Sequence, residues 1–110
     1  MDSITEWRNA IERILSEYTT IPYAHGEIEC EAVFDRQNDR YLLVSVGWNG
    51  ERRVYFTLVH VELRGGKVWI QYDGTEAGIA VELESAGIPR DRIVLGFREP
   101  ALRPYTGYAA

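Results

Sequence analysis

Residues 41–72 decide the fold and read YLLVSVGWNG ERRVYFTLVH VELRGGKVWI QY. Runs of β-branched and aromatic residues are separated here by Asn49-Gly50 and by Gly65-Gly66. Asn-Gly is the strongest short hairpin signal, because both central residues of a type I′ turn need positive φ. A glycine pair turns the chain equally well. The stretch therefore predicts three antiparallel strands, over residues 41–48, 52–63 and 67–72, that are joined by two tight hairpins.

A fourth strand is predicted just upstream, over residues 27–36. Apolar and acidic residues alternate there with a period of two, which is typical of a half-buried strand. The apolar side is formed by Ile28, Cys30, Ala32 and Phe34, and the acidic side by Glu27, Glu29, Glu31 and Asp35. Gln37-Asn38-Asp39 supplies turn residues before the next strand. Four consecutive strands with short turns predict an antiparallel meander.

The N-terminal segment predicts an amphipathic helix. Ser3 and Glu6 form a capping box, and Pro22 ends the helical pattern. Apolar side chains recur at spacings of three and four, as on one helix face. They are Ile4, Trp7, Ile11, Ile14, Leu15 and Tyr18.

A second, shorter helix follows the meander. Thr75 is its predicted N-cap and Gly87 occupies its C′ position. Its apolar side holds Ile79, Ala80, Leu83 and Ala86. The segment 93–95 is predicted as a short strand or a buried tether, and the prolines and glycine after it indicate an irregular C-terminal tail. The fold class is therefore α+β, with both helices on one face of a four-stranded antiparallel sheet.

Length and composition limit the class of protein. The 110 residues form a single predicted domain, 1–110, whose 45% apolar and 26% charged residues are typical of globular chains. A net charge of −5 opposes nonspecific DNA binding unless a local basic patch overcomes it. Cys30 is the sole cysteine, which fits a reducing cytoplasm. No leader or membrane-spanning stretch is evident, so we expect a cytoplasmic protein.

Motifs for chemistry are weak. His60-Val61-Glu62 resembles half of a zinc deaminase signature, but its cysteine pair is missing, so we expect no metal site. No glycine pattern fits a phosphate loop and no serine has a nucleophile context, so we expect no catalytic residue and no cofactor. Residues 73–76, Asp-Gly-Thr-Glu, join a strand to a helix and suit either an anion site or, as we favour, a turn with an N-cap.

Arginine beside aromatic residues suits either a protein interface or nucleic acid. Arg52 and Arg53 lie close to Trp48, and residues 88–110 carry four arginines against two acids. Because the chain as a whole is acidic, we favour the protein interface. The predicted partner-binding residues are Trp48, Arg52, Arg53, Asp73, Thr75, Glu76, Arg103 and Tyr105.

The chain resembles the XisI family, the excision controlling factors of the fdxN element in heterocyst-forming cyanobacteria. The resemblance covers about residues 20–108. It rests on Ile21-Pro22-Tyr23, Gly26-Glu27-Ile28-Glu29, Val46-Gly47-Trp48, Lys67-Val68-Trp69-Ile70-Gln71, Asp73-Gly74-Thr75-Glu76, Ala86-Gly87-Ile88-Pro89 and Tyr105-Thr106-Gly107. It implies an accessory role, together with a nuclease-like factor called XisH, in DNA element excision by a site-specific recombinase. It implies no catalytic residues.

Three functional hypotheses follow. The leading one is a non-enzymatic, homodimeric regulator of DNA excision and recombination that binds an XisH-like protein or a recombinase. The second is a recombination directionality factor that binds DNA directly through Arg52, Arg53 and the C-terminal arginines. The third, the least favoured, is an enzyme that uses His60, Asp73 and Glu76.

Overall fold

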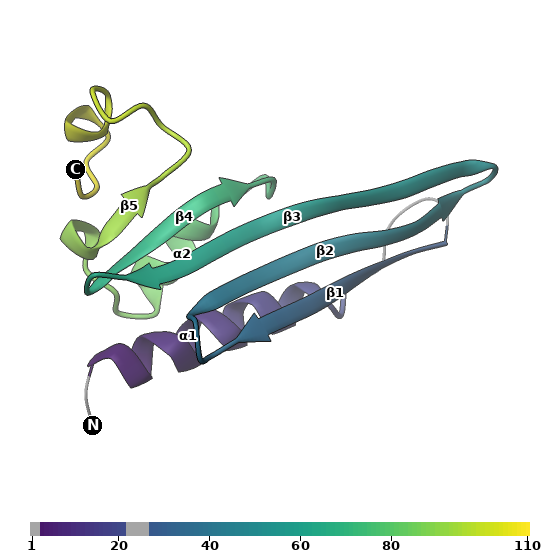
Figure 1. Ribbon diagram of the computed structural model, residues 1–110, viewed down its shortest axis with the longest axis horizontal. Helices are drawn as coiled ribbons and strands as arrows, with labels where there is room; N and C mark the ends of the chain where they lie inside the picture. Colours follow the sequence, from purple (N-terminus) through teal and green to yellow (C-terminus); the bar gives the residue numbers. More distant parts are fainter. Residues whose placement is uncertain (1–2, 22–26) are drawn as a thin grey trace.

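A computed structural model describes residues 3–21 and 27–110. Figure 1 shows a long N-terminal helix and a short second helix on one side of a twisted sheet, with the β2–β3 hairpin projecting away from them. The elements are α1 (Ser3–Tyr18), β1 (Glu27–Asp35), β2 (Arg40–Asn49), β3 (Arg52–Arg64), β4 (Lys67–Asp73), α2 (Ile79–Ser85), η1 (Arg90–Arg92), β5 (Ile93–Leu95) and η2 (Arg103–Tyr105).

Helix α1 confirms the predicted amphipathic pattern. Ile11, Ile14 and Leu15 are buried in the core. The helix ends at Tyr18, and the hydroxyls of the next two threonines fold back onto it. Thr19 Oγ1 donates to the Ser16 carbonyl at 2.6 Å, and Thr20 Oγ1 donates to the Glu17 carbonyl at 2.8 Å. The same carbonyls also accept from the Thr19 and Thr20 amides, at 3.1 and 3.3 Å, so backbone and side-chain donors together bond the end of the helix. Pro22, the predicted stop, lies outside the described residues.

The sheet has the order β1-β2-β3-β4-β5. The first four strands form the predicted antiparallel meander. The sheet has one strand more than the four predicted, because β5 (Ile93–Leu95) pairs in parallel with β4. The helix α2 lies between β4 and β5 in the chain and makes the crossover that a parallel pair requires. Of the two sequence interpretations of residues 93–95, the short strand is correct.

The β2–β3 turn differs by one residue from the prediction. Asn49 pairs with Arg52, so the two loop residues are Gly50 and Glu51 rather than Asn49 and Gly50. Gly50 alone has positive φ, +64°, as the first central residue of a type II′ turn requires. In the β3–β4 turn both Gly65 and Gly66 have positive φ, which fits type I′.

Helix α2 is shorter than predicted. It begins at Ile79 rather than directly after Thr75, and its N-cap residue is Gly78. Ile79, Ala80 and Leu83 are buried, as expected. Gly87 has φ +100° immediately after the C-cap, which confirms its predicted C′ position.

The register assigns each side chain to one of two sheet faces, because paired residues share a side and successive residues alternate. Tyr41, Leu43, Val59 and Val61 face α1 and form the core with it. The opposite side of β1–β3, which we call the open face, is covered by neither helix (Figure 1). It carries Glu27, Glu29, Glu31, Val33, Asp35, Arg40, Leu42, Val44, Val46, Trp48, Arg53, Tyr55, Thr57, His60 and Glu62.

In the described residues, neither helix combines the length and the apolar character needed to cross a bilayer.

Candidate interaction surfaces

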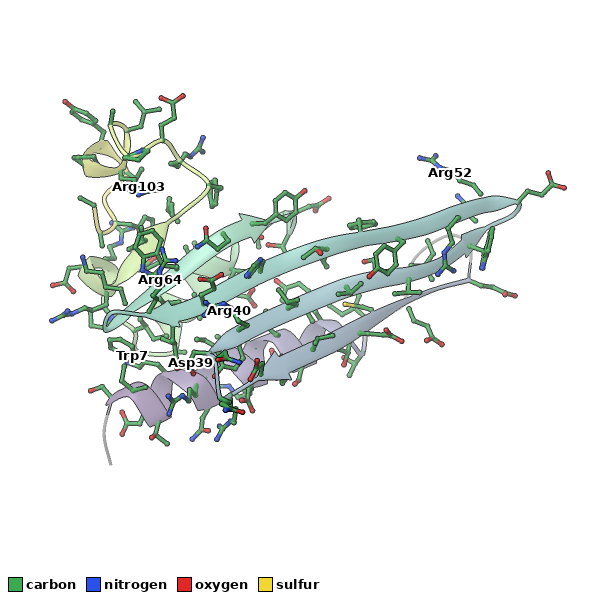
Figure 2. The ribbon with its side chains drawn as sticks, viewed as in Figure 1. Trp7, Asp39, Arg40, Arg52, Arg64 and Arg103 are labelled. Carbon is green, nitrogen blue, oxygen red and sulfur yellow. The ribbon has the colours of Figure 1, made fainter. Side chains whose placement is uncertain are left out.

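The predicted partner-binding residues lie in three separate places. Trp48, Arg52 and Arg53 are at the β2–β3 hairpin, whereas Asp73, Thr75 and Glu76 follow β4. Arg103 and Tyr105 belong to the tail, which we define as residues 96–108. Figure 2 places Arg52 and Arg103 at opposite ends of the molecule. The structure therefore does not bring these residues together into one site.

At the hairpin, Trp48 and Arg53 form a pair on the open face. The guanidinium carbon of Arg53 lies 5.2 Å from the centroid of the Trp48 ring, and Arg53 Nη1 donates to the Gly47 carbonyl at 3.4 Å. A cation above an indole ring is attracted by its quadrupole. Tyr55 stands beside this pair and is 68% exposed. Arg52 is the register partner of Asn49, so it points to the other side of the hairpin.

The Asp73 segment forms the turn that the sequence favoured, although the capping side chain is not the predicted one. Asp73 Oδ2 accepts from the Ile79 amide at 2.7 Å, and Oδ1 accepts from the Thr75 amide and hydroxyl at 2.9 and 2.6 Å. Thr75 Oγ1 accepts from the Gly78 amide at 3.3 Å, so Asp73 rather than Thr75 caps the first helical amide. Both Asp73 oxygens are thus occupied by the chain itself.

This cap gives a testable prediction. Asp73→Ala removes the acceptor of the Ile79 and Thr75 amides, and we expect it to lower the free energy of unfolding by about 1 kcal/mol. Urea unfolding measures the change. Glu76→Ala, which alters an exposed neighbour, is the control and should leave the midpoint unchanged. If Asp73→Ala is as stable as wild type, Asp73 does not stabilise the start of α2 as a cap.

The enzyme hypothesis needs Asp73, Glu76 and His60 to converge. His60 pairs with Tyr72, whereas Asp73 pairs with Val59, so the His60 and Asp73 side chains lie on opposite sides of the sheet. Instead, His60 Nε2 lies 3.0 Å from Glu62 Oε2. No group of three metal-binding side chains occurs among residues 3–21 and 27–110; His25 lies outside them.

The tail is fixed by its own hydrogen bonds. Arg103 donates to the carbonyls of Arg98 and Gly96, at 3.1 and 3.2 Å. Its guanidinium also lies 5.4 Å from the centroid of the Trp69 ring. Arg103 thus holds the tail against β4, while Tyr105 remains 86% exposed.

A charged cluster that the sequence analysis missed lies at the β3–β4 end of the same sheet face. Glu62 is only 8% exposed, and one of its carboxylate oxygens lies 3.4 Å from Arg40 Nε. The other lies 3.7 Å from Arg64 Nη1 and accepts no hydrogen bond from the described residues. The alternation His60-x-Glu62-x-Arg64 was the available signal, since these three positions share one side of a strand.

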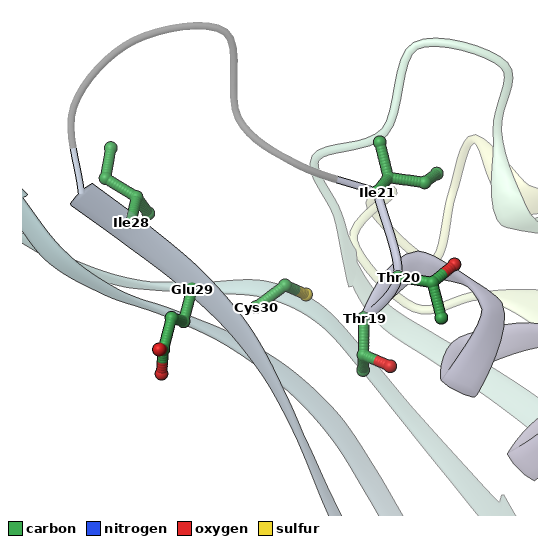
Figure 3. A pocket seen from close by; sticks show the side chains of 6 residues that line it. All are labelled: Thr19, Thr20, Ile21, Ile28, Glu29 and Cys30. Carbon is green, nitrogen blue, oxygen red and sulfur yellow. The ribbon is translucent and has the colours of Figure 1, made fainter.

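A hollow of about 410 Å³ lies between the end of α1 and the start of β1 (Figure 3). Thr19, Thr20 and Ile21 line one side; Ile28, Glu29 and Cys30 line the other. The two threonine hydroxyls are bonded to α1 carbonyls, and burial raises the pKa of the Cys30 thiol, which keeps it protonated at neutral pH. The lining offers no converging set of reactive groups.

These features define a class: a small α+β protein whose helices cover one side of a meander and whose other side and tail carry exposed aromatic and charged residues. The chain belongs to the XisI family, because the family model described as "XisI protein" matches residues 1–110.

Two crystal structures of proteins from Anabaena variabilis ATCC 29413 are similar to this chain. An XisI-like protein is 30% identical, with a TM-score of 0.90 over 98% of this chain and 99% of the other. The fdxN element excision controlling factor XisI is 33% identical, with a TM-score of 0.83 over 98% of each chain. No curated protein matches the chain in sequence. The resemblance noted from the motifs is confirmed.

Proposed function

We propose that this chain is a non-enzymatic accessory factor in the control of DNA element excision and that it works in the cytoplasm by binding an XisH-like protein. Its similarity to an fdxN element excision controlling factor supports the process. The partner follows from the XisI resemblance, which implies that XisI and XisH act together. A site-specific recombinase is the other candidate partner.

The observation that carries the proposal is the set of exposed side chains on the tail. Tyr105 is 86% exposed, Leu102 51% and Phe97 46%. The Tyr105 amide donates to the Leu102 carbonyl at 3.1 Å, within a segment that Arg103 holds to β4. Ordered apolar anchors lose little conformational freedom when they bind. Tyrosine and arginine are also the residues that most often dominate binding energy at interfaces.

Direct DNA binding has less support. It requires several free arginines along one surface. Arg90 pairs with Glu84 and lies 5.0 Å from the centroid of the Tyr108 ring, and Arg103 is bonded to backbone carbonyls. Arg52 lies at the far end of the molecule from Arg103 (Figure 2). We therefore favour a protein partner over a phosphate backbone.

Copurification tests the proposal. An XisH-like protein from the same genome is coexpressed with the tagged chain, and we expect it to be retained at low salt. The double variant Leu102→Ser/Tyr105→Ser should weaken retention by about tenfold, because it removes two exposed anchors. Val81→Ser is the matched control: Val81 is 56% exposed on α2, and the variant should bind like wild type.

Three results separate the alternatives. Failure of the wild-type chain to retain the XisH-like protein, or full retention by the double variant, contradicts the proposal. If the chain retains a recombinase and not the XisH-like protein, the recombinase becomes the proposed partner. A gel shift of duplex DNA whose affinity falls steeply with salt, and which Arg52→Ala/Arg53→Ala abolishes, favours direct DNA binding.

A further inference from the structure

We propose that Arg64 and Arg103, whose guanidinium groups both lie over the ring of Trp69, bind a carboxylate of the protein partner. This inference rests on the proposed function, because it names the chemistry of the partner segment that contacts the tail. Three observations carry it: the two guanidinium groups share one ring, each keeps free N–H groups, and the charge around them is positive.

The Trp69 ring brings together two cations from distant parts of the chain. Arg64 ends β3 and Arg103 belongs to the tail, yet their guanidinium carbons lie 4.5 and 5.4 Å from the centroid of this one ring. The two carbons are therefore no farther apart than these distances added together. Two like charges this close repel each other. An anion that contacts both guanidinium groups would relieve that repulsion.

Both arginines keep N–H groups that the chain does not use. Arg103 donates from Nε and Nη2 to backbone carbonyls, which leaves Nη1 without a hydrogen bond among the described residues. The Arg64 side chain is 54% exposed, and its Nη1 lies 3.7 Å from Glu62 Oε1, which is too far for a hydrogen bond. Guanidinium groups that are held in place and keep free donors suit a planar, bidentate acceptor such as a carboxylate.

Glu62 does not satisfy Arg64 in this arrangement. The Glu62 side chain is only 10% exposed, and its Oε2 lies 3.0 Å from His60 Nε2 and 3.4 Å from Arg40 Nε. Its Oε1 is buried and accepts no hydrogen bond from the described residues. This carboxylate therefore holds Arg64 by charge alone and leaves the N–H groups of Arg64 for a second acceptor.

The charges around the two arginines leave a positive excess. On the open face, Arg40 lies between two acids, its register partner Asp35 and the adjacent Glu62. These three side chains together carry one negative charge. Lys67 is the register partner of Arg64 and adds a positive charge on the same side of the sheet. With the two arginines, this end of the face carries two positive charges in excess, although the net charge of the chain is −5.

A protein carboxylate fits this site better than the phosphates of DNA. DNA carries a charge at every step of its backbone and is bound by a row of cations. The open face instead places Glu27, Glu29 and Glu31 farther along the same side of the sheet, where they would repel a long polyanion. A single acidic side chain needs only the two arginines.

The position of Arg103 connects this site to the proposed interface. Arg103 directly follows Leu102 and lies two residues before Tyr105, the two exposed anchors of the tail. A partner segment that packs on these anchors passes within reach of the guanidinium groups. The other charged side chains of the tail, Arg98 and Glu99, offset each other. We therefore expect the partner segment to carry an aspartate or glutamate beside its apolar residues.

Binding of the XisH-like protein tests the inference in the full chain. Arg64→Ala removes one of the two guanidinium groups and should weaken binding about fivefold at low salt, with a smaller loss at high salt. Arg64→Lys keeps the charge but not the planar fork, so it should recover only part of the affinity. Arg13→Ala, which removes an exposed arginine from α1, is the matched control and should bind like wild type. Equal binding by Arg64→Ala and wild type overturns the inference.

A peptide titration tests the carboxylate site without the partner. Tetraglutamate with blocked ends is added to the isotope-labelled chain, and we expect the indole N–H signal of Trp69 to shift in NMR spectra, with about fivefold weaker binding for Arg64→Ala. Trp48 is the internal control, because it has one arginine above its ring and an acid, Glu27, as its register partner. No response at Trp69, or an equal response at Trp48, contradicts the site. If Arg64→Ala alters the rest of the spectrum, Arg64→Lys and the wild-type titration decide the question.

Phosphate distinguishes the two sources of an anion. Inorganic phosphate and a short DNA duplex are titrated in the same way, and tetraglutamate is expected to act at a lower concentration than either. If either one shifts the Trp69 signal at a lower concentration than tetraglutamate, the site prefers phosphate and the assignment of a protein carboxylate is wrong.

Failure of this inference and failure of the proposed function give different results. If the wild-type chain does not retain the XisH-like protein, the proposed function fails, and the peptide titration alone decides whether the two arginines bind a carboxylate. If wild type and Arg64→Ala retain that protein equally, the proposed function stands and the arginine site is not part of the interface.

Discussion

Gly47→Ala is expected to lower the free energy of unfolding by about 3 kcal/mol. Gly47 is buried in β2 opposite the start of β1, where its register partner is Ile28. A Cβ at position 47 would stand 2.0 Å from the Glu27 carbonyl oxygen and 2.6 Å from the Ile28 Cα. Both are backbone atoms, so no side-chain rotation relieves the overlap. β1 must move away from β2 and give up pairing at its first residues.

Gly50→Ala provides the matched control. Gly50 has φ +64° and open space around its would-be Cβ, so alanine there incurs only the conformational penalty of about 1 kcal/mol. Urea unfolding of the two variants compares the cost of the steric overlap at position 47 with the cost of a positive φ at position 50. The steric explanation is wrong if Gly47→Ala is no less stable than Gly50→Ala.

Asp39→Ala is the second variant for which a large loss is expected, about 2–3 kcal/mol. Asp39 accepts from Arg8 Nε at 2.7 Å, from Arg8 Nη2 at 3.0 Å and from the Tyr41 hydroxyl at 2.9 Å. It thereby joins α1 to the β1–β2 turn. Tyr41 is fully buried, so loss of the acceptor leaves its hydroxyl without this bond. Asp39 also has φ +55°, a conformation that alanine adopts poorly.

Asp39→Asn separates charge from geometry. Asparagine tolerates the left-handed conformation and keeps an acceptor for Tyr41, so we expect a smaller loss than for alanine. If the two variants lose the same free energy of unfolding, the carboxylate charge alone accounts for the stabilisation by Asp39. Chemical unfolding at pH 7 measures both.

The ionised Asp39 side chain also predicts that the stability of the fold depends on pH. Hydrogen bonds from Arg8 hold the pKa of Asp39 below its usual value. Because the folded pKa is the lower one, this contribution is complete above the unfolded value of about 3.9 and is lost as the pH falls through the folded pKa. The stability difference between wild type and Asp39→Asn should therefore shrink below about pH 4. A constant difference from pH 7 to pH 3 would contradict the ionic role of Asp39.

Local signals in the sequence predicted most of the fold. The meander followed from glycine-containing turns and period-two alternation, which depend on neighbouring residues alone. The start of α2 was misplaced because the Asp73 carboxylate reaches the Ile79 amide six residues ahead, a contact that no short motif indicates. β5 was uncertain because three residues show no periodicity and their pairing with Val68 is distant in the chain.

The candidate surfaces were less predictable. Arginine beside an aromatic residue suggested candidate contact surfaces, but this pattern does not say which residues share a face. Strand register separates Arg52 from Arg53. The folding of the tail over β4 places Arg103 against Trp69, a contact across more than thirty residues. The cluster around Glu62 depends on Arg40 from the neighbouring strand, so it requires the sheet pairing before it becomes visible.

The position of β5 has a consequence for synthesis of the chain. Ile93 and Val94 are fully buried, and Ala109 bridges to Val94. A nascent chain that has emerged only through α2 presents the β4 edge unpaired, and such an edge can recruit a strand from another molecule. Segments that leave the ribosome after α2 close this edge, so mutations that delay their docking should first show as aggregation during expression.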